Sequence, residues 1–428
     1  MRLFSSLLLA SLSVSTVLAA DKPPSCDLNN KCPEDKPCCS QYGQCGTGAY
    51  CLGGCDPRSS HSLDSCAPEP ICKSKKYTWD NLDNAAKNDK YLGDASKYDW
   101  MYSGDPKLED GNLILTMPPK SGGSLFANNT TFAFILLSDV KDEIDYEFVG
   151  SDLTEVQTNY YWQGVLDYNN GGKSKVDGED TFGDWHTYEL DWTPDSVEWK
   201  IDGEVKRTLK KSETFNATSN QYQFPQTPSR LQMSLWPAGQ ASNAKGTIEW
   251  AGGEIDWDSE DIQKEGYYFA TIGEVTVECY DPPTGANVNG DKSYIYTDSA
   301  ATNDTVEITD KNTVLSSFGA TGTNMTVSSS TSAQSPTSTS TGKSDTVPEV
   351  NGGSGNEPGN SNGSGSSGSG SDGGSGGSDG DSDSFSQGGD DSDNNNGDGK
   401  NAAASPSERV LKGSFSAVLV AIVVLMTM

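Results

Sequence analysis

The sequence predicts an all-β fold, a β-jelly-roll sandwich, with a small disulfide-rich module before it and a disordered stalk after it. Three observations support this prediction. Short β-rich segments with alternating apolar residues fill positions 73–285, no long stretch there has a helical period, and the composition changes sharply on both sides. Many short strands without competing helices are typical of a two-sheet sandwich or jelly roll.

The first residues read as a secretory signal peptide, residues 1–19. Arg2 precedes a short apolar run around Leu8, and the small residue Ala19 closes it. A membrane helix is disfavoured because Ser and Thr interrupt the run and it is too short. Ten cysteines and several N-x-Ser/Thr sites also favour an oxidising, glycosylating export route. These sites are Asn128, Asn129, Asn216, Asn303, Asn324 and Asn362.

Residues 20–72 form a cysteine-rich module that is too small for a core of its own. The first eight of its cysteines form an even set, and the sequence leaves 105 pairings among them open. They are Cys26, Cys32, Cys38, Cys39, Cys45, Cys51, Cys55 and Cys66. A zinc site is the alternative, which export disfavours. Cys72 and Cys279 remain outside this set, and we predict that they form a disulfide.

Seven segments of the central domain, residues 73–285, are predicted as strands: 112–117, 132–137, 143–149, 185–192, 197–201, 230–236 and 270–280. Asp202-Gly203 between two of them is a hairpin signal.

The segment 142–147, DEIDYE, carries the strongest chemical signal. In a strand, Glu143, Asp145 and Glu147 share one face and the apolar residues between them share the other. Three like charges in a row are costly, and a pair of carboxyls is what glycoside cleavage needs. We predict Glu143 as nucleophile and Glu147 as acid/base, with Asp145 separating their pKa values. A solvated acidic strand is the alternative.

A second strand, 230–236, shows the same two-faced pattern. Arg230 and Gln232 are candidates for binding sugar hydroxyls, and Trp236 and Trp250 are candidate sugar platforms, with core packing as the alternative for both. Further cleft candidates are Tyr161, Trp162 and Gln163. His186 either touches a sugar or is a buried, hydrogen-bonded structural residue. With two histidines in the chain, neither a zinc site nor a Ser-His-Asp triad is plausible, and no metal or cofactor is expected.

The sequence after residue 285 predicts a stalk and a membrane anchor. Residues 286–400 are rich in Ser, Thr, Gly, Asn and Asp and are expected to be a disordered stalk. Residues 401–428 combine small residues, a polar spacer and a short apolar tail, which matches a GPI-attachment signal with Asn401 as the attachment residue. A transmembrane anchor is the alternative. The net charge of −31 argues against nucleic-acid partners.

Several motifs resemble the fungal Crh cell-wall transglycosylases of glycoside hydrolase family sixteen. They are DEIDYEFVG (142–150), WHTYELDW (185–192), VEWKIDGEVKRTL (197–209), TPSRLQMSLWPAG (227–239) and AKGTIEWAGG (244–253). The resemblance implies a jelly roll, a nucleophile at Glu143, an acid/base at Glu147, and Thr247 among the substrate-binding residues. It also implies cleavage of chitin and transfer of the new end to β-glucan.

The run CCSQYGQCGTGAYC, residues 38–51, resembles hevein-type chitin-binding modules. Ser40, Tyr42 and Tyr50 match the sugar-binding positions of that family. Gln44 stands where an aromatic residue is usual, which predicts weak chitin affinity. A spacer that binds nothing is the alternative.

The predicted protein is therefore a secreted, GPI-anchored, monomeric transglycosylase of the cell wall, acting on chitin and β-glucan. One segment departs from the resemblance. The connection 117–132 is short, and relatives place at least two further strands there, on the order of 20–30 residues. This motivates the alternatives of a catalytically impaired carbohydrate-binding wall protein and of a purely structural wall glycoprotein.

Overall fold

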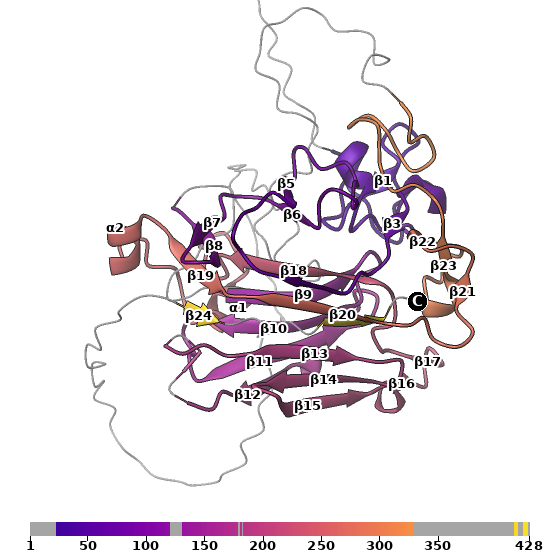
Figure 1. Cartoon of the computed structure of the whole chain (residues 1–428). Helices are drawn as coiled ribbons and strands as arrows, with labels where there is room; N and C mark the ends of the chain where they lie inside the picture. The colour runs from indigo at the N-terminus through magenta and orange to yellow at the C-terminus, as the bar shows by residue number, and fades with distance from the viewer. Residues whose placement is uncertain are drawn as a thin grey trace, which may run out of the picture.

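The computed structural model describes residues 23–119, 131–178, 180–181, 183–327, 415–417 and 423–426 (Figure 1). Most described elements are strands, and the helices are short. The expected all-β sandwich is confirmed.

The first sheet of the sandwich carries the acidic strand near its centre. Its order is β12-β11-β10-β9-β18, with neighbours antiparallel, so that β18 forms one edge. The strands are β9 (Thr131–Ser138), β10 (Glu143–Val149), β11 (Glu155–Tyr161), β12 (Gly172–Lys175) and β18 (Ser229–Trp236).

The opposing layer consists of two hydrogen-bonded groups. One has the order β15-β14-β13-β25-β20-β4 and the other the order β24-β19-β8-β7. Their strands are β4 (Lys75–Tyr77), β7 (Lys107–Glu109), β8 (Asn112–Met117), β13 (Tyr188–Trp192), β14 (Ser196–Ile201), β15 (Glu204–Lys210), β19 (Tyr268–Ile272), β20 (Val275–Tyr280), β24 (Phe415–Ala417) and β25 (Val423–Met426).

Local sequence explains the β14–β15 hairpin. Alternate residues of β14 are buried, as expected for a strand with one face on a core. Asp202 and Gly203 at the turn have φ values of 52° and 81°. Two positive φ values in a row define the turn that matches the twist of paired strands, and Asp-Gly adopts it readily.

The inward side chains of the two layers form the main hydrophobic core, which includes Tyr146 of β10, Leu190 of β13 and Trp199 of β14. Tyr146 OH donates to the Lys200 carbonyl at 2.8 Å, and Trp199 Nε1 donates to the Asp145 carbonyl at 2.9 Å. Buried polar atoms are costly unless they are bonded. These bonds therefore fix the opposing layer directly beneath the acidic strand.

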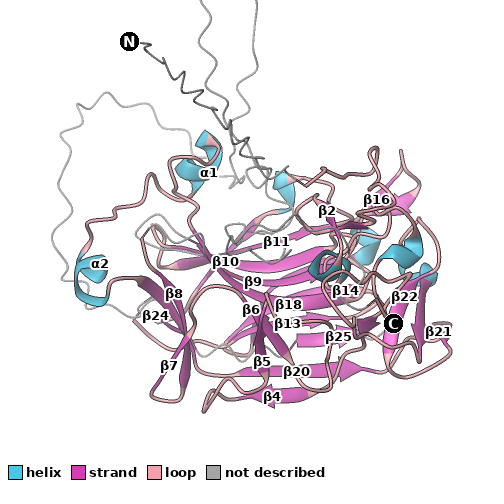
Figure 2. Ribbon diagram, turned by 90° about the horizontal axis from the view of Figure 1, so that it is seen from above, coloured by secondary structure: helices cyan, strands magenta, loops and turns pink. Residues whose placement is uncertain are grey.

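The smaller elements lie around the sandwich. Two short sheets pair β5 (Ala85–Lys87) with β6 (Trp100–Tyr102) and β16 (Phe215–Asn216) with β17 (Gln221–Tyr222). Helix α1 (Lys245–Trp250) lies beside the first sheet in the second view, and α2 (Glu260–Glu265) lies at the periphery (Figure 2). Helix α2 begins at the Ser259 cap and ends at Gly266, whose φ of 79° suits a left-handed cap.

The cysteine-rich module is held by four disulfides: Cys26–Cys39, Cys32–Cys45, Cys38–Cys51 and Cys55–Cys66. It contains β1 (Cys38–Cys39) and β2 (Cys45–Gly46). The fifth disulfide joins Cys72 to Cys279, the pairing expected from the sequence, and ties the entry of the sandwich to β20.

The expectation of a disordered stalk from residue 286 is wrong for the residues up to 327. Residues 287–327 fold into a small lobe with β21 (Asn287–Val288), β22 (Ser293–Tyr296) and β23 (Val306–Thr309), and β22 pairs with β3 (Glu69–Pro70). Leu315 and Ala320 of this lobe are buried together with Tyr50 and Leu52 of the cysteine-rich module. The lobe lies beside the module in Figure 1. The sequence of this lobe is rich in Ser and Thr, and its few buried apolar residues were therefore not recognised as a core.

The tail expected to be a GPI signal contributes two strands to the described structure. Strand β24 runs parallel to β19, and β25 lies between β13 and β20, parallel to both. Asn401, the signal peptide and the sites at Asn128, Asn129 and Asn362 lie outside the described residues. Among the described residues, no helix has the length and apolar character needed to cross a membrane.

The segment 270–280 forms two strands rather than the one predicted. Strand β19 ends at Ile272 and β20 begins at Val275, with Gly273 between them. Strand β8 ends at Met117 in one layer and β9 begins at Thr131 in the other, and most of the short connection lies outside the described residues.

Candidate active site

Strand β10 places its three acidic residues on the face opposite the core, as the alternation predicts. In register on β11, Tyr161 lies opposite Glu143, Asn159 opposite Asp145, and Gln157 opposite Glu147. Paired residues of antiparallel strands project from the same face. The three carboxyls therefore share that face with a phenol and two amides.

All three carboxyl residues are buried, with exposed fractions of 1% for Glu143, 1% for Asp145 and 3% for Glu147. The sequence led us to expect a face open to solvent or ligand. Instead, the residues are shielded from water, which strengthens every electrostatic interaction among them. Four strand steps separate the Cα atoms of Glu143 and Glu147 by about 13 Å. Their side chains must lean toward each other to act on one bond.

The environment of Asp145 sets its protonation. Burial raises the pKa of Asp145 to about 7, against the smaller lowering effects of Arg207, of the Asn159 main chain and of a hydrogen bond with the Glu143 side chain. Asp145 is thus protonated about half the time at neutral pH, and because the bond with Glu143 lowers its pKa, Asp145 accepts that bond in its ionised form. A partly protonated Asp145 places less negative charge between the two glutamates than a fully ionised one would.

Arg207 reaches this region from β15 of the opposing layer. Its Nη1 donates to the Thr158 carbonyl and hydroxyl, each at 2.8 Å, and its Nη2 donates to the Asn170 carbonyl at 2.6 Å. The guanidinium also lies over the Trp199 ring at 4.5 Å. It is a fixed positive charge below the acidic face, and sequence reasoning did not single it out because it belongs to another layer.

Two tryptophans lie together near the Glu147 end of the acidic face. The rings of Trp236 and Trp250 stack with centroids 5.7 Å apart and planes 25° apart. Trp250 Nε1 donates to Gln157 Oε1 at 2.9 Å, and Gln157 is the register partner of Glu147. Trp236 is buried and Trp250 half-buried, so the rings form a packed wall rather than an exposed platform. Thr247, on the same helix as Trp250, is also buried.

At the Glu143 end of the acidic face, two residues predicted to bind sugar instead bond other residues of the protein. Arg230 forms an ion pair with Asp139 at 2.6 Å. Gln163 donates through Nε2 to the Ala300 and Ala301 carbonyls, at 2.8 and 3.1 Å. These side chains link the sheet to neighbouring parts of the chain. Trp162 lies in the turn after β11, and Gln232 lines a cavity beside β18.

The turn before β10 contains two carboxylates that the sequence analysis missed. Asp142 accepts four hydrogen bonds, from the main chain of Gln163, Gln226 and Thr227 and from the Thr227 hydroxyl. Burial nevertheless raises its pKa above the ordinary value. Asp142 fixes the start of the acidic strand. The signal was present in SDVKDE, where a tight turn directly precedes Glu143.

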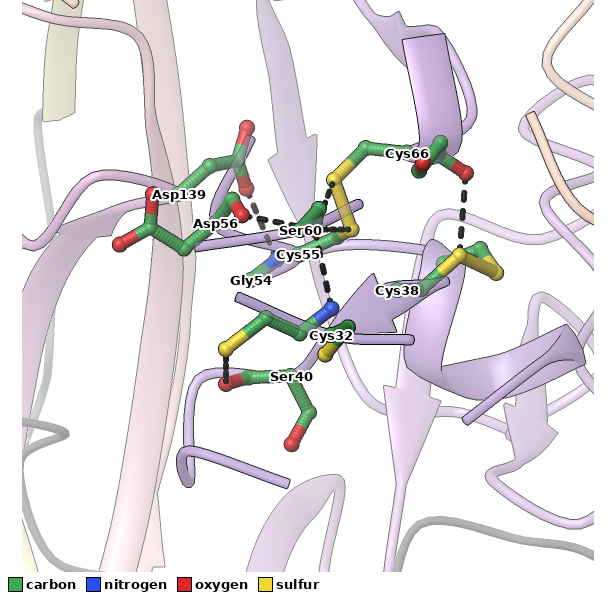
Figure 3. Close-up of a disulfide and its surroundings, with 12 residues drawn as sticks. Cys32, Cys38, Ser40, Gly54, Cys55, Asp56, Ser60, Cys66 and Asp139 are labelled. Atoms are coloured by element: carbon green, nitrogen blue, oxygen red, sulfur yellow. Dashed lines mark hydrogen bonds between the residues drawn. A yellow bond between two sulfur atoms is a disulfide. The ribbon is translucent and has the colours of Figure 1, made fainter. Parts of the chain in front are cut away.

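Asp139, the second of these carboxylates, joins three parts of the chain. It accepts from the Gly54 main chain at 2.8 Å, from Arg230 Nη1 at 2.6 Å and from the Tyr294 hydroxyl at 2.9 Å. Figure 3 shows Gly54 and Asp139 beside the Cys55–Cys66 disulfide. The cysteine-rich module is therefore held against the first sheet by a buried polar cluster.

The module's predicted sugar-binding residues are largely covered. Tyr50 is buried with Leu315 and Ala320, and Ser40 is also buried. Tyr42 is half-buried and lines the same cavity as Gln232.

His186 has a structural environment, one of the two roles that the sequence left open. Its Nδ1 lies 2.8 Å from Asp202 Oδ2, and its Nε2 lies 3.3 Å from the Asp180 carbonyl.

This chain is similar to several known proteins. Residues 127–252 match Glycosyl hydrolases family 16. Crh-like protein 2 of Aspergillus fumigatus is 64% identical over the full length of both chains. Congo red hypersensitive protein 2 of Saccharomyces cerevisiae is 46% identical over 70% of this chain and 69% of its own. The solved structure of a Crh5 transglycosylase in complex with NAG is 26% identical, covers 59% of this chain and 99% of its own, and has a TM-score of 0.42.

The alignment with the Aspergillus protein spans 447 positions, whereas this chain has 428 residues, so at least 19 positions of the alignment have no residue here.

Proposed function

Because this chain belongs to the Crh-like proteins of glycosyl hydrolases family 16, we propose that it is a retaining transglycosylase of the cell wall, with chitin as donor and β-glucan as acceptor. The observation that carries the proposal is the row of three carboxyls on one buried face of β10, with the middle one titrating near neutrality. The donor and acceptor are those that the resemblance to the Crh transglycosylases implies.

In the proposed reaction, the Glu143 carboxylate attacks the anomeric carbon while the Glu147 carboxyl protonates the departing glycosidic oxygen. This leaves a covalent glycosyl-enzyme. Glu147, now ionised, removes a proton from the acceptor hydroxyl, which attacks the same carbon and releases Glu143. Asp145 hydrogen-bonds Glu143, and the proton that it carries part of the time reduces repulsion within the row.

A transfer assay with chitin oligomers and a labelled β-glucan acceptor tests the proposal. Glu143→Gln should reduce labelled product to below about a thousandth of the parent, because the nucleophile is lost. Glu155→Gln is a matched control: this glutamate lies on β11, half-buried, with its carboxylate 3.6 Å from Lys173 Nζ. It should leave transfer near the parent value. Equal labelling by Glu143→Gln and the parent would remove the proposal.

The second candidate is a wall protein that binds carbohydrate without turnover. The observation that favours it is the burial of all three carboxyl residues. Saccharide binding by the parent chain without any labelled product would select this function.

We also propose that the protein is exported through residues 1–19, is attached through Asn401 to a GPI anchor at the outer face of the plasma membrane and cell wall, and acts as a monomer. The signal-like composition of both ends supports export and anchoring. Release from membranes by a phosphatidylinositol-specific phospholipase is the expected result. Protein retained in the membrane fraction would contradict the anchor.

A further inference from the structure

Arg207 of β15 is a half-buried arginine whose hydrogen bonds to the described residues all go to neutral groups. These groups are the carbonyls of Thr158 and Asn170 and the Thr158 hydroxyl. Burial lowers the pKa of Arg207, and the charge of Asp145 opposes this effect. A charge taken out of water is costly when no opposite charge is paired with it. The position of this guanidinium behind the acidic strand therefore needs an explanation.

The surroundings of Arg207 hold its guanidinium in one place. The central carbon lies over the Trp199 ring at 4.5 Å and over the Tyr160 ring at 5.8 Å. A Cβ added to Gly172 of β12 would lie 3.2 Å from Arg207 Nη1 and 3.5 Å from its Cζ. Because these contacts and the hydrogen bonds leave the planar group little freedom, Arg207 acts as a fixed positive charge.

Two of these neighbours connect Arg207 to the middle of the acidic strand. Trp199 Nε1 donates to the Asp145 carbonyl at 2.9 Å. Thr158 directly precedes Asn159, which is the register partner of Asp145 and whose main chain donates to the Asp145 carboxyl. Arg207 therefore contacts both the ring and the strand that hold Asp145 in position.

The other ionisable groups beside Asp145 in the first sheet are acids and a phenol. Glu143 and Glu147 lie on its own strand, and β11 contributes the Tyr161 phenol. The register partners on β9, residues 133–137, are all apolar. Carboxylates this close repel one another, and each proton that they keep reduces the repulsion. A positive charge nearby has the opposite effect, because it favours the ionised form.

Two other cations of the first sheet and its turns act on different groups. Lys141, in the turn before β10, interacts with the charge of Glu143. Arg230 of β18 is held in an ion pair with that same turn. Arg207 is the cation whose charge favours the ionised carboxyl of Asp145.

We propose that Arg207 is a positioning residue for the transfer reaction, which keeps β10 in place and stabilises the fully ionised form of the Glu143–Asp145 pair. The proposal rests on the proposed function and adds a residue to it. The two carboxyls share a hydrogen bond and therefore titrate as a pair. Glu143 attacks only after the shared proton leaves to water, which places two negative charges side by side. A fixed positive charge behind the strand, in a region of low dielectric, favours this form.

The pH dependence of transfer from chitin oligomers to a labelled β-glucan acceptor tests the proposal in the full chain. Arg207→Met keeps an unbranched side chain and removes the charge, so the pair should hold its proton to higher pH. We expect the acid limb of the kcat profile to move upward by about one pH unit, which is about a tenfold loss of transfer at a pH on that limb.

Two variants separate charge from packing. Arg207→Lys keeps the charge but loses the planar fork, so its acid limb should stay within about 0.3 unit of the parent while kcat falls several-fold at every pH. Lys210→Met is the matched control, because it removes an exposed positive charge from the same strand. It should leave both the limb and kcat unchanged.

A second readout needs no turnover. Carbon-13 NMR follows the titration of the Asp145 carboxyl in protein labelled at aspartate, and Asp145→Asn identifies the signal. The midpoint should move upward by about one pH unit in Arg207→Met and stay in place in Arg207→Lys. If circular dichroism shows that Arg207→Met does not fold, Arg207→Gln replaces it, since its amide can still donate to the Thr158 carbonyl.

An unmoved carboxyl midpoint, or transfer that falls equally at every pH in Arg207→Met with the acid limb in place, would overturn the proposal and leave Arg207 a purely structural residue. An equal shift of the limb in Arg207→Lys would also contradict it. Failure of the proposed function is seen separately, as transfer that survives Glu143→Gln or as a parent chain that makes no labelled product.

Discussion

The fold alters the ionisation of Asp145 on the acidic face. Burial raises its pKa from 3.8 to about 7. The folded chain therefore binds this proton more tightly than the unfolded chain does. As a result, the contribution of Asp145 to the free energy of unfolding falls as the pH rises from about 4 to about 7.

Asp145→Asn removes this titration. We expect the variant to be more stable than the parent at pH 7, by on the order of 2–4 kcal/mol, and the difference to shrink as the pH falls toward 4. Denaturant unfolding of both chains between these pH values measures it. The control is Asp152→Asn, which changes a half-buried carboxylate 3.1 Å from Lys173 Nζ. Parallel stability curves for Asp145→Asn and the parent would contradict the assignment.

Gly54 is a residue of the module that contacts the first sheet, through a hydrogen bond from its main chain to Asp139. Its φ is 85°, and an added Cβ would lie 2.7 Å from Gln41 Oε1 and 2.9 Å from Arg230 Nη2. Gly203 has a φ of 81° but open space around it. Alanine at either position therefore has the same backbone strain, and only at Gly54 does it also meet neighbouring atoms.

We expect Gly203→Ala to lower the free energy of unfolding by about 1 kcal/mol, the usual effect of left-handed backbone, and Gly54→Ala to lower it by a further 1–2 kcal/mol or so. Chemical denaturation of both variants gives the difference. Equal losses of unfolding free energy in the two variants would mean that Gln41 and Arg230 move aside at no measurable cost.

At the scale of elements, the sequence predicted strands well where one face is apolar and the other polar. Strands β8 and β10 have the predicted bounds, because NLILTM and EIDYEFV pack on a core. Strand β11 was missed: its sequence, EVQTNYY, is polar on the candidate site face and mixed on the other. The carboxyl row was therefore predictable, whereas its amide and phenol neighbours on β11 depended on a pairing that the sequence does not display.

Contacts between distant segments account for the remaining differences. Arg230 and Gln163 have the residue types of sugar contacts, but Arg230 donates to Asp139 and to Gln41 of the module. Gln163 donates to Ala300 of the 287–327 lobe. The alternation of residues within one strand does not reveal hydrogen-bond partners that lie on distant segments of the chain.

The C-terminal strands lead to an element-scale prediction. Strand β25 hydrogen-bonds both β13 and β20, so GPI attachment at Asn401 would remove it and leave two facing edges without that partner. We expect a chain ending at Asn401 to remain folded but to melt several degrees below the full chain. Thermal unfolding of the two chains compares them. Identical melting temperatures would show that the tail adds no stability.

At the scale of the whole molecule, one long covalent link spans the sandwich. The Cys72–Cys279 disulfide joins residues 207 apart in sequence. Closing so long a loop restricts the unfolded chain strongly. We expect replacement of both cysteines by alanine to lower the free energy of unfolding by about 3–5 kcal/mol. Replacing Cys72 and Cys279 should cost more than removing Cys55–Cys66, whose loop spans 11 residues, and the reverse order in denaturant unfolding would contradict this account.

The module, the sandwich and the 287–327 lobe are predicted to unfold together. Leu315 of the lobe is 1% exposed and packs with Tyr50 and Leu52 of the module, while Tyr294 of the lobe bonds Asp139 of the first sheet. Scanning calorimetry should therefore show one transition. Leu315→Ala should shift that whole transition downward, by about 2–5 kcal/mol in unfolding free energy, because it opens a cavity in a shared core. Leu28→Ala, at a position 59% exposed, should leave it almost unchanged. A separate early transition in Leu315→Ala, with the main one unmoved, would show instead that the module is an independent unit tethered to the sandwich.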